Sequence, residues 1–318
     1  MISDLLLALA LACIQGLTEF LPVSSSAHLL FPSLLFGAKD FGLVFDIAVH
    51  AGTLAAVVFY FKDDILKLLE AWMPWTRNRN EGDFLLGLNL IIATMPIVFV
   101  GLIFSDLISA RLHSIDSIAW ANLIFAGLLL IAFKLSSQNK NILGLTLSMA
   151  VFIGCLQALA VFPGASRSGM AITGALFVGL NLKDSSKFAF LLSIPTILGA
   201  MILMIAKEAY VLSLDDLMIL LTGFIGSGVI AFFTIKIFLF CEDSLKAISK
   251  SPAKIRLAHA IEPMLCNLAD IKSEKINPTN TIGTVAIIKF KPSKKSPSLR
   301  LLVQGIQACR SFNMSSLK

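Results

Sequence analysis

Apolar residues gather in long stretches that short polar segments separate. Five of these stretches come near the length of about 20 residues that a helix needs to cross a bilayer. They are residues 41–61, 84–104, 118–133, 188–206 and 217–240. Two further apolar regions, 2–36 and 142–182, are each interrupted by a polar cluster rich in serine. The pattern predicts an all-α fold, a polytopic membrane helical bundle.

Composition supports a membrane protein and divides the chain. Of 318 residues, 57% are hydrophobic and only 14% are charged, whereas soluble domains carry about 25% charged residues. Residues 1–240 hold 13 Lys and Arg against 15 Asp and Glu, and 241–318 hold 13 against 5, which gives the net charge of +6. We expect an integral membrane domain at 1–240 and an atypical, polar, basic cytoplasmic tail at 241–318, compatible with disorder. A basic segment beside a membrane is typical of lipid contact, so no nucleic acid partner is expected.

The charges of the loops predict how the chain crosses the membrane. Lys and Arg are concentrated in the loops 62–83 and 134–141 and in the turn 183–187, while 105–117 and 207–216 are poor in them. The positive-inside rule therefore places the first three segments in the cytoplasm and the last two outside. The spans alternate correctly only if each interrupted region enters the membrane and returns to its own side. One re-entrant, broken-helix hairpin then enters from each side.

The two interrupted regions are related in sequence. A shift of 142 positions, without a gap, aligns residues 13–26 with 155–168. Identical residues then coincide at six pairs of positions: Cys13 and Cys155, Gln15 and Gln157, Leu17 and Leu159, Phe20 and Phe162, Ser24 and Ser166, Ser26 and Ser168. This predicts an inverted-topology repeat with halves of approximately 1–133 and 134–240, whose hairpin tips meet inside the membrane.

The second cluster carries groups suited to an anion. A Pro-Gly pair cannot continue a helix, and Ser166 and Ser168 can cap the helix that follows, whose backbone N–H groups favour an anion. Arg167 adds a guanidinium fork that matches phosphate oxygens and is costly at membrane depth unless a negative group meets it. The alternative is that Arg167 only pairs with Glu19 to hold the two tips together.

The first cluster adds a carboxylate, hydroxyls and an imidazole: Glu19, Ser24, Ser25, Ser26 and His28. Single serines in such positions are most often helix caps, and a histidine at a helix start can be purely structural. Asp46 and His50 lie four residues apart in a predicted span, so they share one helix face. An ionisable pair inside a membrane indicates function, although a purely structural pair remains open.

At these residues the sequence resembles the bacterial undecaprenyl-diphosphate phosphatases, also called the bacitracin-resistance protein family. The family patterns (Glu/Gln)-x-x-x-Glu, Pro-Val-Ser-Ser-x-x-His and Pro-Gly-x-Ser-Arg-Ser-x-x-Thr correspond to residues 15–19, 22–28 and 163–171, and 45–53 is also similar. The resemblance covers roughly residues 1–240. It implies an enzyme that hydrolyses undecaprenyl diphosphate to undecaprenyl phosphate and inorganic phosphate. This reaction recycles the lipid carrier of peptidoglycan synthesis and confers bacitracin resistance.

The resemblance also implies roles for the residues of the two clusters. Arg167 would bind the diphosphate and stabilise the transition state. Further substrate-binding residues would be Ser24, Ser26, Gly164, Ser166 and Ser168. Ser25 is the candidate nucleophile with His28 as its base. A water nucleophile, with Ser25 only as a phosphate ligand, remains open.

A divalent cation, Mg²⁺ or Ca²⁺, is the implied cofactor. Glu19 and Gln15 would help to hold it, because both ions prefer oxygen ligands. Asp46 and His50 would support the site from its periphery. The implied partner is a polyprenyl diphosphate lipid in the bacterial inner membrane, with the site opening to the outer, periplasmic face. A homodimer is compatible with the sequence.

The sequence departs from the family pattern at three places. Gln15 replaces the commoner glutamate, Ala171 stands where threonine is usual, and the family's additional helix after 217–240 has no counterpart in the tail. Two alternatives therefore remain open. One is a lipid-phosphate flippase or transporter, because inverted repeats with broken helices are typical of secondary transporters. The other is an inactive, truncated relative.

Overall fold

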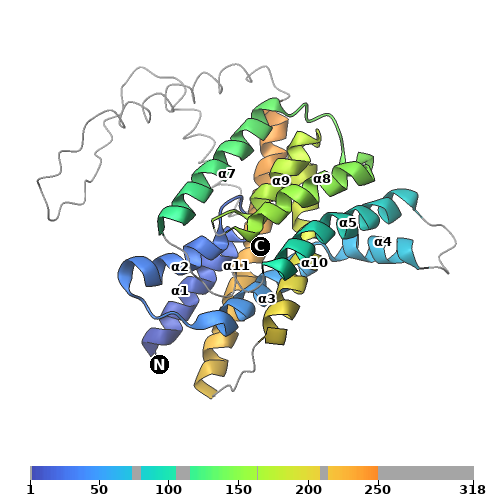
Figure 1. Cartoon of the computed structure of the whole chain (residues 1–318). Coiled ribbons are helices and arrows are strands. Elements are labelled where there is room, and N and C mark those ends of the chain that lie inside the picture. The colour runs from blue at the N-terminus through green and yellow to red at the C-terminus, as the bar shows by residue number, and fades with distance from the viewer. Residues whose placement is uncertain (1, 74–79, 105–114, 163, 208–213, 250–318) are drawn as a thin grey trace, which may run out of the picture. The chain divides into compact units, whose positions relative to one another are not determined.

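The computed structural model describes residues 2–73, 80–104, 115–162, 164–207 and 214–249 (Figure 1). Most of the predicted tail lies outside the described residues, as do Pro163 and most of the two loops predicted to face outward. The chain divides into two compact units, Met1–Asp243 and Ser244–Lys318. All the candidate site residues belong to the first unit.

Within the described ranges the chain forms α-helices, two 3₁₀ helices and no β-strand. The elements in chain order are α1 (Ile2–Thr18), α2 (Ser25–Phe36), α3 (Gly42–Tyr60), α4 (Lys62–Trp72), α5 (Glu81–Ile103), α7 (Ile115–Leu135), η1 (Ile142–Gly144), α8 (Leu147–Ala158), η2 (Leu159–Val161), α9 (Arg167–Phe177), α10 (Leu182–Lys207) and α11 (Leu214–Ser249). The predicted all-α class is confirmed.

Five helices of the described part are long and apolar enough to cross a membrane, namely α3, α5, α7, α10 and α11. Each overlaps one predicted span, so the five predicted spans are confirmed as apolar helices of sufficient length. The stretch 118–133 is only the middle of α7, which has Asp116 in its first turn and Lys134 in its last turn. These charges complement the helix dipole, so the helix continues over them.

Two segments predicted as connections are helical instead. The prediction of a turn at 183–187 is wrong, because these residues lie in the first turns of α10. The side chain of Asn181, just before this helix, accepts the Asp184 N–H at 3.1 Å. Polar residues at such a position cap a helix and need not interrupt one. Part of the loop 62–83 is α4, whose Ile65 and Leu68 pack against the core. The polar residues of α4 therefore form one face of an amphipathic helix.

The two interrupted regions each form a pair of short helices. Helices α1 and α2 have 17 and 12 residues, and α8 and α9 have 12 and 11, whereas a span needs about 20. We call residues 19–24, between α1 and α2, the first tip, and residues 162–166, before α9, the second tip. That these segments re-enter the membrane as inverted repeats stays a prediction.

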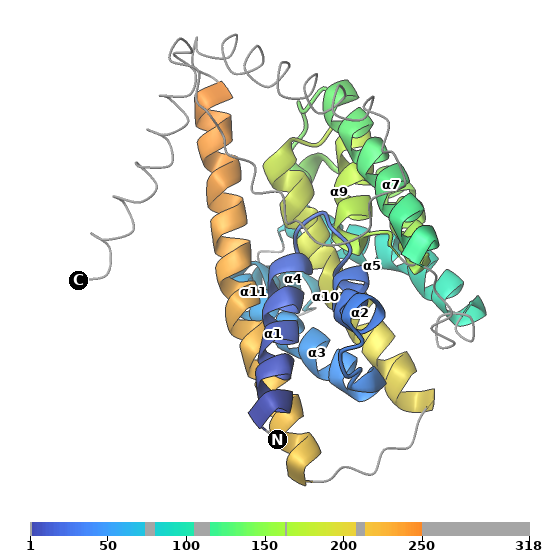
Figure 2. The same ribbon diagram turned by 90° about the vertical axis from the view of Figure 1, so that its left-hand side faces the viewer.

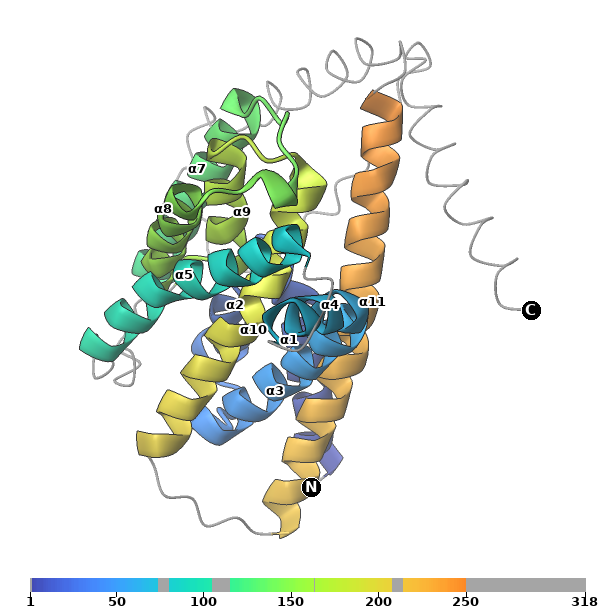
Figure 3. The same cartoon turned by 90° about the vertical axis from the view of Figure 1, so that its right-hand side faces the viewer.

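Glycines allow the helices to cross closely. An added Cβ on Gly154 of α8 would meet the Ala93 carbonyl oxygen of α5, and one on Gly52 of α3 would meet the Phe224 carbonyl oxygen of α11. Figures 2 and 3 show α11 beside α1 and α3, with α7, α8 and α9 grouped on the other side of α10. Such backbone approaches are typical of helix packing in membranes.

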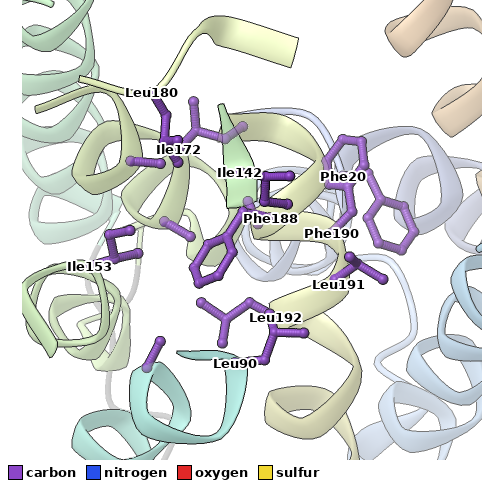
Figure 4. Close-up of a cluster of buried hydrophobic side chains, with 14 of the residues drawn as sticks. Phe20, Leu90, Ile142, Ile153, Ile172, Leu180, Phe188, Phe190, Leu191 and Leu192 are labelled. Atoms are coloured by element: carbon purple, nitrogen blue, oxygen red, sulfur yellow. The ribbon is translucent and has the colours of Figure 1, made fainter. Parts of the chain in front are cut away.

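The largest buried apolar cluster reaches the first tip (Figure 4). Phe20 is fully buried, and its ring packs edge-on against Phe190 of α10 with 5.3 Å between centroids. Burial of a phenylalanine side chain stabilises a fold by about 1.5–3 kcal/mol. Phe20 therefore fixes the first tip against α10 and positions its neighbour Glu19.

Candidate active site

The two tips are in direct contact. Arg167 Nη2, at the start of α9, donates to Glu19 Oε1 of the first tip at 2.8 Å, across 148 residues of chain. Ser168 Oγ donates to the Leu21 carbonyl at 2.8 Å. The two polar clusters therefore lie side by side, as the aligned segments of the sequence predict.

Both helices that leave the tips begin in the same way. Ser24 caps α2 and its Oγ accepts the Ala27 N–H at 3.4 Å, while Ser166 caps α9 and its Oγ accepts the Gly169 N–H at 3.1 Å. Each capping hydroxyl also contacts the serine two residues on, Ser26 at 3.2 Å and Ser168 at 3.1 Å. Two helix N-termini with paired hydroxyls thus flank the point where the tips meet, a combination that favours an anion.

Glu19 is the side chain that both tips share. Its carboxylate is only 4% exposed, and Oε1 accepts the hydrogen bond from Arg167. Oε2 accepts one hydrogen bond from Ser25 Oγ at 2.6 Å and another from Gln15 Nε2 at 2.8 Å. A buried carboxylate is tolerated when it is paired and hydrogen-bonded, and these donors fulfil both conditions.

Arg167 has capacity beyond this ion pair. Its side chain is 25% exposed, far more than that of Glu19. A guanidinium has five N–H donors, of which the described contacts engage one at Nη2. Arg167 therefore does pair with Glu19, as the alternative interpretation requires, yet this pair leaves N–H donors of Arg167 available for a phosphate.

A histidine of α3 approaches the same carboxylate. His50 Nε2 lies 3.7 Å from Glu19 Oε2, and His50 Nδ1 donates to the Asp46 carbonyl at 2.7 Å. Because a carbonyl only accepts, Nδ1 carries a proton and Nε2 is the nitrogen turned toward Glu19. The pair predicted at the periphery thus reaches the site directly through His50, which Asp46 orients through its backbone.

His28, like His50, is oriented by a hydrogen bond from its Nδ1 to the backbone carbonyl four residues before it. Its Nδ1 donates to the Ser24 carbonyl at 2.6 Å, and its ring lies against Phe31 with 5.5 Å between centroids. In the neutral ring the lone pair is therefore on Nε2. The Ser25 hydroxyl donates to Glu19, and the hydrogen bonds of the described residues do not join it to His28. The role of His28 as a base stays a prediction.

Gly164 holds the second tip against α7. Its φ of +94° is one that residues with a side chain rarely adopt, and an added Cβ would lie 2.7 Å from the Ile118 carbonyl oxygen. The structure thus gives this glycine a backbone role. Its contact with substrate stays a prediction.

The residues around Glu19 offer few ligands of their own to a cation. Gln15 is fully buried, and its Oε1 has no hydrogen-bond partner in the described part of the chain. In the part of the chain that the structure describes, no group of three or more His, Cys, Asp or Glu side chains is placed to hold a metal ion. The protein therefore supplies one carboxylate and one amide oxygen. Mg²⁺ is commonly held by one or two carboxylates together with substrate phosphates, and Glu19 and Gln15 fit an ion of that kind.

Two contributors to the site were not predicted from the sequence. The Leu21 carbonyl accepts the Ser168 hydroxyl, and Phe20 anchors the first tip. A backbone acceptor leaves no mark in a sequence. In the sequence Phe20 stands out only because it aligns with Phe162 in the repeat. Phe162 is 59% exposed whereas Phe20 is fully buried, so the alignment alone does not show which phenylalanine anchors a tip.

Comparison with known proteins places this chain in a family. The family described as "Bacitracin resistance protein BacA" matches residues 8–247. An undecaprenyl-diphosphatase of Teredinibacter turnerae is 49% identical over 195 residues, which are 61% of this chain and 74% of the relative. An undecaprenyl-diphosphatase of Alcanivorax borkumensis is 43% identical over 237 residues, 73% of this chain and 88% of the relative. The chain therefore belongs to the BacA bacitracin resistance protein family.

Proposed function

We propose that this protein is an undecaprenyl-diphosphatase, which hydrolyses undecaprenyl diphosphate to undecaprenyl phosphate and inorganic phosphate. The reaction returns the lipid carrier to peptidoglycan synthesis and underlies bacitracin resistance. One observation carries the proposal beyond the names of the relatives. A single buried carboxylate, Glu19, binds the hydroxyl of Ser25 and the guanidinium of Arg167, so a nucleophile and a phosphate-binding group are held on either side of it.

The substrate is a diphosphate on a long apolar chain, so the enzyme acts as a multi-pass membrane protein. Five apolar helices of the described part support this. We assign the protein to the inner membrane, with the site open to the periplasmic face. The basic loops between the predicted spans support the assigned direction of the spans, because they favour the cytoplasmic side.

Phosphoryl transfer needs an aligned nucleophile and neutralisation of the phosphate charge. Ser25 Oγ attacks the terminal phosphorus, a new O–P bond forms, and the bond from this phosphorus to the bridging oxygen breaks. Undecaprenyl phosphate leaves with the bridging oxygen, and the proton of Ser25 passes to Glu19, which already accepts its hydrogen bond. Arg167 binds the oxygens of the transferred group, with the N-terminal hydroxyls Ser166 and Ser168 beside it.

The second step releases phosphate from Ser25. Water attacks the phosphoserine, the serine oxygen leaves, and it regains a proton from Glu19. The free Nε2 of His28 is suited to accept the proton of this water, because the Ser24 carbonyl fixes the other ring nitrogen as a donor.

A divalent cation, Mg²⁺ or Ca²⁺, would be held by Glu19 and Gln15 together with the substrate's phosphates. When bound, it neutralises phosphate charge. Gln15 Nε2 donates to Glu19, and its Oε1 has no hydrogen-bond partner among the residues that the structure describes, which supports this assignment.

Phosphate release from undecaprenyl diphosphate by the purified full chain in detergent tests the function. We expect turnover by wild type and a loss of at least a hundredfold in Arg167→Ala. A flippase or transporter would bind the lipid without releasing phosphate, and an inactive relative would also release none. Transport of the lipid across vesicles separates these two outcomes.

Rapid quenching tests the nucleophile. If Ser25 attacks, a phosphoserine at this position accumulates in wild type, and Ser25→Ala abolishes it. Turnover without a trapped phosphoserine would instead assign the attack to water and leave Ser25 as a phosphate ligand.

A further inference from the structure

A cavity of about 130 Å³ lies where the two tips meet helix α7. One part of its wall belongs to the site already described, because Ser166 and Gly164 of the second tip line it. The other part of its wall is largely apolar. The apolar residues that matter here are Phe125, Ala126 and Leu129 of α7 and Met170 of α9. Asn122 of α7 also lines the cavity, and its Nδ2 donates to the Ile118 carbonyl of the same helix at 3.0 Å. The cavity therefore has a polar end at the anion-binding tip and a mainly apolar face at α7.

Helix α7 is the least buried of the candidate spans in the described part of the bundle. Only 11% of its span is buried, against 28% to 39% in the other four spans. Trp120, Leu123 and Ile124 are exposed on it, and in a bilayer such residues contact lipid tails. Ala126 is also exposed while lining the cavity. The small side chain at this position leaves the cavity close to the lipid-facing surface of α7.

We propose that this cavity receives the first isoprene unit of the polyprenyl diphosphate, and that Phe125, Ala126 and Leu129 determine how the chain leaves the site. The inference rests on the proposed function and names the place of the apolar chain. The occupant follows from continuity, because an apolar group attached to a phosphate near Ser166 is the one that meets the apolar wall. An apolar cavity of about 150 Å³ holds one benzene-sized molecule, so this cavity holds one branched unit. The rest of the chain then follows α7 into the lipid.

Filling the cavity from α7 tests the proposal. The variants are Ala126→Leu and Ala126→Phe, and the matched controls are Gly127→Leu and Gly127→Phe. An added Cβ at Gly127 meets no atom within 4 Å, so these controls place the same groups on the next residue without entering the cavity. The milder leucine variant keeps the test open if the phenylalanine variant does not fold.

Binding is measured with a polyprenyl methylenediphosphonate, which cannot be hydrolysed, and with inorganic diphosphate as a competitor for the polar end. We expect the Kd of the lipid analogue to rise at least tenfold in the Ala126 variants and to stay unchanged in the Gly127 controls. The Kd of inorganic diphosphate, obtained from the competition, stays unchanged in all of them. An unchanged Kd in the Ala126 variants overturns the proposal, and so does an equal loss of inorganic diphosphate binding, which would mean that the phosphate site itself was distorted.

Phosphate release from undecaprenyl diphosphate is measured on the same samples. If the Ala126 variants weaken binding of the analogue as expected and wild type releases no phosphate, the proposed enzymatic function fails while the assignment of the cavity stands. If wild type releases phosphate but the Ala126 variants bind the analogue as tightly as wild type, the assignment of the cavity fails while the enzymatic function stands.

Discussion

Replacement of Arg167 by alanine removes the guanidinium that joins the two tips. Loss of one contact to the charge of a transition state costs about 3 kcal/mol, and a tenfold change in rate corresponds to about 1.4 kcal/mol. We therefore expect kcat for phosphate release to fall at least a hundredfold in Arg167→Ala. The same change leaves the carboxylate of Glu19, 4% exposed, without its cationic partner. An uncompensated buried charge destabilises a fold by about 3–5 kcal/mol, so the thermal midpoint should fall as well.

Two further variants separate catalysis from this structural tie. Arg167→Lys keeps a positive charge near Glu19 and loses the planar fork, so we expect near-normal unfolding and at least a tenfold loss of kcat. Adding Glu19→Gln to Arg167→Ala removes the unpaired charge, so the thermal midpoint should recover in part while activity stays lost. Full activity in Arg167→Lys, or more than a tenth of wild-type kcat in folded Arg167→Ala, would refute the assigned role and leave Arg167 as a link between the tips.

Three other predictions concern the hydroxyl, the helix packing and the cation. Ser25→Ala should lower phosphate release at least a hundredfold. Ser33→Ala should leave it unchanged, because the Ser33 hydroxyl donates to the Leu30 carbonyl within α2. Equal effects would contradict a special role for Ser25. Gly154→Ala places a Cβ against the α5 backbone and should lower the free energy of unfolding by about 1–3 kcal/mol. Gly101→Ala, with open space around its Cβ, should be neutral or stabilising. Equal thermal midpoints of the two variants in detergent would show that α5 and α8 move apart to accept the added group. EDTA should stop phosphate release, and excess Mg²⁺ or Ca²⁺ should restore it; release that EDTA leaves undiminished would exclude the cation.

The spans could be predicted because their signal is a continuous apolar stretch of sufficient length, as in α3 and α5. The ends of the helices could not be predicted, because charged residues such as Asp116 and Lys134 occur both in loops and in the terminal turns of helices. The segment 183–187 shows the same difficulty, since its polar residues become the capped start of α10 only through contacts of Asn181 and Asp184. Which polar residues belong to a helix thus depends on pairings that a charge count does not contain.

The candidate site was predictable to the level of residue types and of the two clusters that meet. Its hydrogen-bond partners were not. The resemblance implied that His28 acts as the base for Ser25, yet the Ser25 hydroxyl donates to Glu19, six residues before it. Asp46 and His50 were predicted only as a pair at the periphery of the site, and the packing of α3 brings Nε2 of His50 to 3.7 Å from Glu19 Oε2.

The alignment of the two tips explains why one carboxylate can serve both. Under the 142-residue shift Ser25 and Arg167 occupy the same position, and each is the first residue of the helix that its capping serine begins. Equivalent helix starts that meet at one point therefore present a hydroxyl from one side and a guanidinium from the other. Glu19 aligns with Val161, so the carboxylate occurs in one copy only, and each of its oxygens binds one of the two equivalent residues. A second carboxylate at position 161 would compete for Arg167 and repel the phosphate, so we expect Val161→Glu to weaken inorganic diphosphate binding, whereas Val161→Gln, of similar size and without the charge, should weaken it less.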